Sequence, residues 1–184
     1  MTTHSYLNDQ IITIDNFISC AKCHEFIEKI DNEKIARNFT NSGNFTNRRY
    51  VDNDLSQWFY KLLVNALGAP LADKLKIKRA NELIMTGKYD ESQEFGLHTD
   101  TGAYYDRVLA EKSNYTLLIY LNDDYDGGTT AFFDDKFNPI LDIVPKKGMA
   151  LLFDIDLWHQ GNKVVDGTKY WIGCEIIGSF ANQI

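Results

Sequence analysis

Apolar side chains recur at two different spacings along the chain, and the first spacing is helical. Over residues 19–31 they return every three or four positions, which predicts an amphipathic helix with Ser19 as its N-cap. The stretch that follows Asp54 shows the same period and ends at Gly68 and Pro70, so we expect a second helix capped by Asp54. Each helix carries one apolar face that needs a partner surface.

From about residue 77 onward the pattern changes to short β-type runs separated by Gly, Asp and Asn. Together with a short strand at Ile11–Ile14, these runs predict a single α+β domain over residues 1–184. Helical support is expected over about 1–76, and a β-sandwich or jelly-roll barrel core over about 77–184. The expected strands of the core are Glu82–Tyr89, Glu94–Thr99, Tyr115–Asn122, Thr129–Phe133, Ile140–Val144, Met149–Phe153 and Lys169–Ile177.

Composition narrows the class of protein. The chain has 184 residues, 44% hydrophobic and 24% charged, which suits one globular domain with a sizeable core. A formal charge of −7 disfavours binding to nucleic acid or to anionic membranes, and strongly anionic substrates would be poorly steered. The polar start and the absence of a long apolar stretch predict a cytoplasmic protein without a signal peptide or transmembrane segment.

Three cysteines are too few and odd in number for a disulfide framework, which favours a reducing environment. Cys20, Cys23 and His24 have a spacing that a zinc site can use. No second ligand pair of matching spacing follows, so we expect a helix that buries its two cysteines instead.

Two histidines and one aspartate form the strongest chemical pattern. His98 and Asp100 are two residues apart at the end of a predicted strand, so both side chains point to the same face. His159 follows the apolar run Met149–Phe153. Two histidines and a carboxylate are the ligand set of non-haem Fe(II) oxygenases, in which other metal positions stay open for a cosubstrate and O₂.

Lys169 opens the last predicted strand, ten residues after His159, and alternates to one side with Trp171, Gly173 and Glu175. A lysine directed into a barrel is costly unless it meets an anion, and the far carboxylate of a metal-bound 2-oxo acid is such an anion. The alternative is a turn lysine after Asp166-Gly167 that faces solvent.

Combined, these motifs resemble the 2-oxoglutarate and Fe(II)-dependent oxygenases of the prolyl 4-hydroxylase type. The resemblance covers most of the chain from about Ile11. It implies a double-stranded β-helix, a jelly-roll or cupin-like barrel, with the N-terminal helices packed on the major sheet. The ordered motifs are His98-Thr99-Asp100, the run 116–122 (Thr-Leu-Leu-Ile-Tyr-Leu-Asn), Asp126-Gly127-Gly128-Thr129, His159-Gln160-Gly161 and Lys169.

The resemblance also implies roles for single residues. His98, Asp100 and His159 match the iron ligands, and Lys169 matches the residue that pairs with the C5 carboxylate of 2-oxoglutarate. Tyr89 and Tyr120 are candidates for the cosubstrate pocket or, alternatively, packed barrel aromatics, and Thr116 and Leu118 line the same pocket by alternation with Tyr120. One departure is that Tyr89-Asp90-Glu91-Ser92 stands where prolyl hydroxylases commonly have Tyr-x-Pro-Gly, which bears on prolyl specificity more than on metal chemistry.

The expected activity is hydroxylation of a C–H bond in a prolyl or other residue of a peptide or protein, with Fe(II), 2-oxoglutarate and O₂ and with ascorbate as a supporting reductant. Retention of Asp100 argues against the halogenase variant. Two alternatives stay open: a hydroxylase of a free amino acid or small metabolite, and a non-catalytic sensor of metal or 2-oxoglutarate. Substrate selection is expected on two polar loops, 38–53 and 103–107, and the candidate substrate residues are Arg48, Tyr50, Tyr104 and Trp158.

Overall fold

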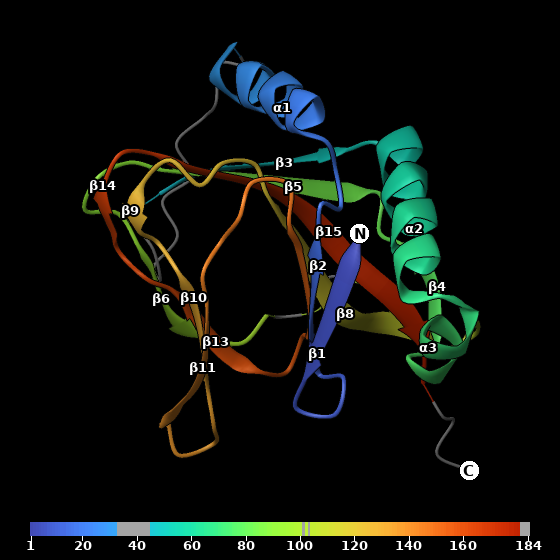
Figure 1. The fold of residues 1–184 in the computed structure, drawn as a ribbon. Coiled ribbons are helices and arrows are strands. Elements are labelled where there is room, and N and C mark those ends of the chain that lie inside the picture. Colours follow the sequence, from blue (N-terminus) through green and yellow to red (C-terminus); the bar gives the residue numbers. More distant parts are fainter. Residues whose placement is uncertain (33–44, 101, 103, 181–184) are drawn as a thin grey trace.

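Two β-sheets form the body of the computed structural model, which describes residues 1–32, 45–100, 102 and 104–180 (Figure 1). Within these residues the larger sheet has nine strands. Its order is β1 (Thr2–Tyr6), β2 (Ile11–Asp15), β12 (Ala150–Asp154), β8 (Glu111–Tyr120), β15 (Lys169–Ser179), β5 (Leu83–Tyr89) and β3 (Thr46–Val51), with β4 (Ile77–Ala80) paired to β15 and β7 (Tyr105–Asp106) paired to β8. The smaller sheet runs β11 (Pro139–Ile143), β10 (Thr130–Phe133), β13 (Trp158–Gly161) and β6 (Phe95–His98), and β9 (Asp126–Gly127) pairs with β14 (Val164–Asp166).

The central strand β8 is buried on both faces. Leu117 and Ile119 belong to the cluster that also contains helix residues, whereas Tyr120 and its neighbour Leu118 pack with Phe132 of the smaller sheet. Because side chains alternate along a strand, one face of the larger sheet meets the helices and the other meets the smaller sheet. This two-layer arrangement with helices outside confirms the α+β double-stranded β-helix expected from the sequence.

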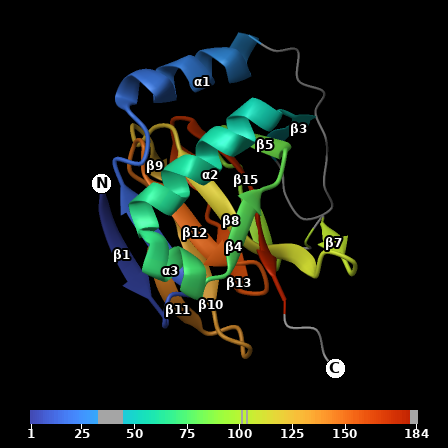
Figure 2. The same ribbon diagram turned by 90° about the vertical axis from the view of Figure 1, so that its right-hand side faces the viewer.

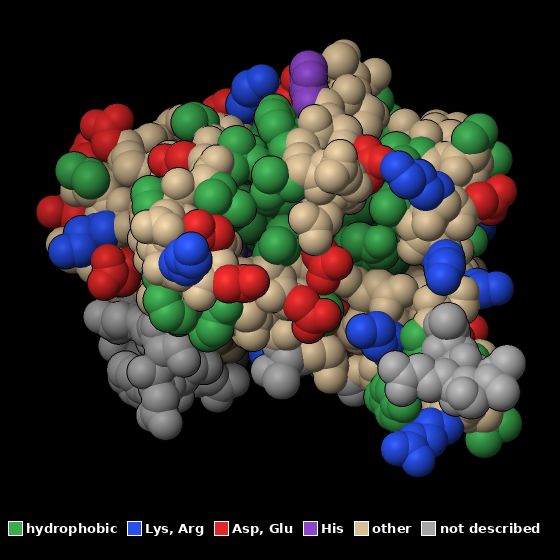
Figure 3. All heavy atoms as spheres, turned by 90° about the horizontal axis from the view of Figure 1, so that it is seen from below, with side chains coloured by type: hydrophobic (Ala, Val, Ile, Leu, Met, Phe, Trp, Pro, Cys, Tyr) green, Lys and Arg blue, Asp and Glu red, His purple; other side chains and the backbone are tan. Residues whose placement is uncertain are grey.

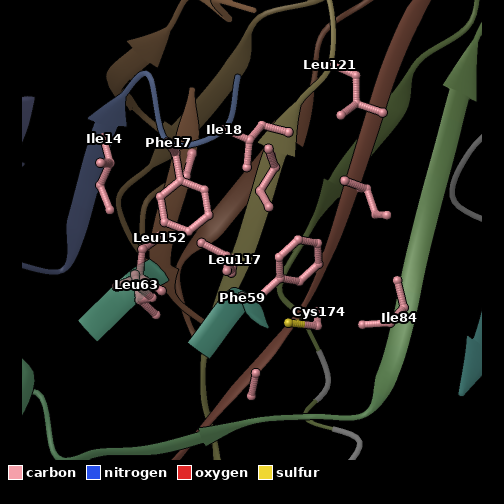
Figure 4. Close-up of a cluster of buried hydrophobic side chains, with 14 of the residues drawn as sticks. Ile14, Phe17, Ile18, Phe59, Leu63, Ile84, Leu117, Leu121, Leu152 and Cys174 are labelled. Atoms are coloured by element: carbon pink, nitrogen blue, oxygen red, sulfur yellow. The ribbon is translucent and has the colours of Figure 1, made fainter. Parts of the chain in front are cut away.

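The described residues form three helices, α1 (Cys20–Asn32), α2 (Asn53–Leu67) and α3 (Ala69–Lys74). Figures 1 and 2 show α1 and α2 on the outer face of the larger sheet. Phe59 and Leu63 of α2 are fully buried and point toward the sheet residues Leu117 and Leu152 (Figure 4). Burial of each such side chain contributes about 1.5–3 kcal/mol, so the helices brace the sheet that carries the site.

The helix boundaries confirm the periodicity and correct two details. Ser19 caps α1 through its hydroxyl, which accepts a hydrogen bond from Lys22 N at 3.2 Å. The cap of α2 is Asp52 and not Asp54, because the Asp52 carboxylate accepts from Leu55 N at 2.9 Å. The expectation that α1 buries both cysteines is wrong for Cys20, which is exposed, while Cys23 is buried.

The predicted strands of the core are all present, with ends shifted by a few residues. The loop expected over 38–53 is wrong for residues 46–51, which form the edge strand β3 paired with β5, while residues 38–44 lie outside the described residues. An edge strand tolerates the polar sequence Asn47-Arg48-Arg49 because one side of it stays open to water. The first 76 residues therefore supply three strands, β1, β2 and β3, as well as helices.

Acidic and basic side chains alternate around a central apolar area on the face shown in Figure 3. None of the helices in the described residues combines the length and the apolar character that a membrane crossing needs.

Candidate active site

Two histidines are brought together by the pairing of β6 with β13. His98, the last residue of β6, lies directly opposite His159 in this antiparallel ladder, and the two ring centroids are 4.2 Å apart. His159 is buried beneath Phe153, whose ring centroid lies 4.6 Å from that of the imidazole, while His98 stays partly exposed. Cross-strand partners share a face of the sheet, so both imidazoles point into the space between the two sheets.

Asp100 joins the pair just after the end of β6. Its backbone N–H donates to the carbonyl of Ile155 at 3.1 Å, and its Oδ2 accepts a hydrogen bond from the Thr116 hydroxyl at 2.6 Å. The carboxylate oxygens lie 3.5 Å from His98 Nε2 and 3.8 Å from His159 Nε2. Burial alone raises the pKa of Asp100, but its hydrogen bonds and the neighbouring imidazoles outweigh this and lower the pKa, so the group is an anion at neutral pH.

The donor atoms of His98, Asp100 and His159 fit a divalent metal ion. They lie within 4.8 Å of one another. Nδ1 of His98 faces the Gly96 carbonyl at 2.7 Å, and Nδ1 of His159 faces the Leu157 carbonyl at 2.9 Å. A carbonyl can only accept, so each Nδ1 carries the proton and each Nε2 keeps a lone pair for a metal. Two neutral imidazoles and one carboxylate are the donors that non-haem Fe(II) sites use.

Lys169 occupies the other end of the same pocket. It is 4% exposed, so the predicted alternative of a solvent-facing turn lysine is wrong. Its ammonium donates to the carbonyl of Gly128 at 2.6 Å and lies over the rings of Tyr89 and Tyr120, at 5.6 and 5.2 Å from their centroids. No carboxylate in the described residues lies within ion-pair distance of it. Burial lowers the pKa of Lys169 to about 7, and an anion that enters the pocket would favour its charged form.

The remaining residues predicted for the cosubstrate, Tyr89, Tyr120, Thr116 and Leu118, all line the pocket between the triad and Lys169. The hydroxyl of Tyr120 pairs with Thr130 at 2.7 Å, and burial raises the pKa of both tyrosines, so their hydroxyls stay neutral. Thr116 lines the wall, but its hydroxyl is committed to Asp100.

Several wall residues were not predicted. Phe45 stacks on Tyr89 with centroids 4.3 Å apart, and Phe95 lies 5.0 Å from Phe45 and 3.9 Å from His98. Thr130, Met85, Phe153 and Trp171 complete much of the lining. Alternation with Lys169 was a signal for Trp171, whereas Thr130 reaches the pocket only through sheet pairing that no local pattern reveals.

Tyr125 adds a feature near the lysine. Its ring lies against Gly128, whose positive φ of 62° presents the carbonyl to Lys169, and a Cβ at that glycine would meet the Tyr125 ring at 2.8 Å. The Tyr125 hydroxyl is buried and has no hydrogen-bond partner among the described residues. Burial raises its pKa, so it is a neutral donor beside the lysine end of the pocket.

The four candidate substrate residues are placed unequally. Arg48 is among the residues that line the pocket, although its guanidinium carbon lies over the ring of Tyr50, 5.2 Å from the ring centroid. Tyr50 itself packs against the helix side of the sheet, Tyr104 stacks with Arg79, and Trp158 packs edge-on against Phe137. The structure does not bring these last three to the pocket wall. Arg49, which was not among the four, does line it.

The segment that replaces Tyr-x-Pro-Gly keeps the shape of a turn. Gln93 N–H donates to the Asp90 carbonyl at 3.0 Å, and Ser92 has φ 68°. A positive φ at the third of four residues is typical of a type II turn, in which Pro is favoured at the second position and Gly at the third. Glu91 and Ser92 therefore take the places of Pro and Gly in such a turn.

Comparison with known proteins gives the family. The model of the 2OG-Fe(II) oxygenase superfamily matches residues 84–174, about half of the chain. No curated protein matches the sequence.

Similar solved structures have the same fold. A viral collagen prolyl hydroxylase from Paramecium bursaria Chlorella virus-1, in a 2OG complex, is 22% identical with a TM-score of 0.63, over 93% of this chain and 97% of that chain. A Pseudomonas putida prolyl-4-hydroxylase is 12% identical with a TM-score of 0.66, over 94% of each chain. A Trichoplax adhaerens prolyl hydroxylase, in complex with a hypoxia inducible factor oxygen degradation domain peptide fragment, is 14% identical with a TM-score of 0.64, over 92% of this chain and 84% of that chain. With its double-stranded β-helix and its pair of histidines and aspartate, the chain belongs to the 2OG-Fe(II) oxygenase superfamily.

Proposed function

We propose that the protein is a 2-oxoglutarate- and Fe(II)-dependent dioxygenase that hydroxylates a prolyl or other residue in a peptide or protein. The observation that carries the proposal is one pocket with a metal-type triad at one end and, at the other, the buried amino group of Lys169, which has no carboxylate partner among the described residues. A dicarboxylate with an α-keto group has the two ends that these groups would bind, because its keto acid end chelates a metal and its far end is an anion.

Each protein group has a stated task in this mechanism. His98, Asp100 and His159 would hold the iron, and Lys169 would pair with the far carboxylate and so fix the orientation of 2-oxoglutarate. When bound, Fe(II) with 2-oxoglutarate and O₂ supplies the oxidation, in which one oxygen atom goes to succinate, with release of CO₂, and the other becomes the substrate hydroxyl. The aromatic wall of Phe45, Tyr89 and Phe95 would keep water from this end of the pocket.

A prolyl residue is the favoured target because the similar structures include enzymes named for prolyl hydroxylation, one of them in complex with a peptide. The turn at Asp90–Gln93 is compatible with this choice, since it keeps the type II geometry that Pro-Gly favours. Ascorbate as a supporting reductant and a reducing, cytoplasmic location also belong to the proposal. The odd and small number of cysteines supports the reducing environment.

The test is the production of succinate from 2-oxoglutarate with Fe(II) and ascorbate, run with a panel of prolyl peptides and free amino acids and followed by mass spectrometry for a gain of one oxygen. We expect turnover by the wild type and its loss in His159→Ala, with His24→Ala as the control on an exposed histidine. An unchanged rate in His159→Ala would contradict the triad. Binding of 2-oxoglutarate without turnover on any substrate would favour the sensor, and oxygen gain only on free amino acids would favour the small-molecule hydroxylase.

A further inference from the structure

Arg49 lies on the pocket side of the edge strand β3. The cross-strand pairs Leu118 with Gly173, Gly173 with Met85, and Met85 with Arg49 form one row across β8, β15, β5 and β3. Leu118 and Met85 line the pocket, and so does Arg49 at the end of the row. Gly173, at the centre of the row, has no space for a side chain, because a Cβ would lie 2.1 Å from the Leu117 carbonyl oxygen. No side chain therefore stands between Leu118 and Met85 in this row.

The side chain of Arg49 is exposed, and its guanidinium makes no hydrogen bond or ion pair with any other described residue. Its strand neighbour Arg48 instead packs over Tyr50, and alternation places Arg48 and Tyr50 on the face opposite Arg49. Arg49 is therefore a permanent positive charge at the pocket wall, and no described residue neutralises it.

The charge of the pocket is opposite to that of the whole chain. Among the described lining residues, Arg49 and Lys169 direct a basic side chain toward the pocket, since the Arg48 guanidinium lies over Tyr50 on the opposite face, and Asp100 is the carboxylate. The full chain carries a net charge of −7. Lys169 and Asp100 are already assigned to the cosubstrate and the metal, so the positive charge at β3 is left for the substrate. A guanidinium fork matches a carboxylate better than it matches any neutral group.

We infer that the substrate presents a carboxylate to Arg49, and that in a peptide this carboxylate is a Glu or Asp side chain close to the hydroxylated residue. The inference rests on the proposed function and adds the chemical class of the substrate to it. The metal-type triad contacts β8, where Thr116 bonds Asp100. Three strand-to-strand steps, about 14 Å, separate β3 from β8, and an extended peptide covers this in about four residues. The acidic residue therefore lies within four positions of the reacting one. We expect one such acidic residue and not a highly acidic peptide, because the net negative charge of the protein would repel many carboxylates.

The test uses pairs of prolyl peptides that differ only by Glu or Gln at the positions within four residues of the proline. For the wild type we expect KM to be about threefold to tenfold lower for a Glu peptide than for its Gln partner, with kcat similar. In Arg49→Gln this difference should vanish, and in Arg49→Glu it should reverse for a peptide with Lys at the same position. Lys78→Gln is the matched control, since Lys78 is an exposed cation on β4, another strand with one partner, and lies outside the pocket lining.

The outcomes separate this inference from the proposed function. Hydroxylation of Glu and Gln peptides with equal KM, unaffected by Arg49→Gln, would overturn the role of Arg49 and leave the hydroxylase intact; Arg49 would then only protect an edge strand from aggregation. Hydroxylation of free proline but not of prolinamide, lost in Arg49→Gln, would support the same contact with the α-carboxylate as its source. If neither succinate nor an oxygen gain is found with any peptide or amino acid, both proposals fail.

Discussion

His98 and His159 are direct cross-strand partners on β6 and β13, with their ring centroids 4.2 Å apart and each Nδ1 facing a backbone carbonyl. This relationship fixes both rings before any ligand arrives, because the ladder sets their positions and the carbonyls set their tautomers. A metal ion would therefore meet two Nε2 lone pairs and the Asp100 carboxylate already converged. Little of its binding free energy would be spent on ordering the ligands.

The first prediction concerns metal-dependent stability. Mn(II) serves as a metal probe in a measurement that involves no turnover. It should raise the melting temperature of the wild type, because it binds only the folded triad. At a hundred times Kd the gain is about 2.7 kcal/mol. His98→Ala and His159→Ala should lose this gain, as measured by circular dichroism melts with and without the ion, while His24→Ala keeps it. Equal stabilisation of wild type and both triad variants would show that the ion binds elsewhere.

Thr116 provides the second prediction. Its hydroxyl holds Asp100 Oδ2 at 2.6 Å, so Thr116→Val, which keeps the shape of the side chain, frees the carboxylate to rotate. Loss of such an orienting bond should weaken metal affinity about 10- to 100-fold, measured by titration with Mn(II). The control is Thr86→Val, a buried threonine on β5. If Thr116→Val binds Mn(II) as tightly as Thr86→Val does, Thr116 only lines the pocket wall and does not orient Asp100.

The pair His98 and Asp100 was predictable from the sequence for a local reason. His98 and Asp100 are two residues apart, and the spacing predicts a shared face by strand alternation, although β6 ends at His98 and contacts with Ile155 and Thr116 hold Asp100 in place. The longer core strands could also be predicted, because a sheet buried on both faces leaves continuous apolar runs such as that in β8, whereas short or polar strands such as β3 and β13 were not predicted. Lys169 was predictable in position, although only the structure shows that it is buried without a carboxylate partner in the described part of the chain.

The rest depends on pairing between distant segments. β13 reads Trp-His-Gln-Gly and has no apolar alternation, so its position opposite β6 had no local signal. The register of β3 on β5 decides that Arg49 shares a row with Met85, and a slip of one residue would exchange it with Arg48. The bond from Thr116 on β8 to Asp100, which follows the end of β6, likewise joins separate segments and cannot be inferred from alternation.

The third prediction addresses the turn after Tyr89. Ser92 has φ 68°, a conformation that costs a residue with a side chain about 1 kcal/mol, and Glu91 N–H makes no hydrogen bond with a described residue. The double substitution Glu91→Pro with Ser92→Gly should therefore stabilise the protein by about 1 kcal/mol, measured by urea unfolding. Affinity for 2-oxoglutarate should not change. Destabilisation would mean that the turn is not of type II or that the Glu91 N–H is needed.

The fourth prediction follows from the pKa of Lys169, which burial lowers to about 7. At pH 8 the free lysine is mostly neutral, and the far carboxylate of 2-oxoglutarate favours its charged form, so binding should take up close to one proton. Affinity should then fall about tenfold per pH unit between pH 7 and pH 9 and level off below pH 7, where the lysine is already charged. The rings that face the ammonium, Tyr89 and Tyr120, stay neutral in this range because burial raises their pKa.

Calorimetry of 2-oxoglutarate binding to the Mn(II)-loaded protein, in buffers with different ionisation enthalpies, measures the proton uptake directly. Lys169→Arg is the informative comparison, because a guanidinium is charged at every pH tested and should reduce the uptake at pH 8 to near zero. Lys169→Met removes the charge and should weaken binding at all pH values, with the pH dependence lost. Wild-type binding without proton uptake at pH 8 would mean that Lys169 is charged in the free protein, and that the carbonyl of Gly128 and the two aromatic faces stabilise the ammonium enough to offset its burial.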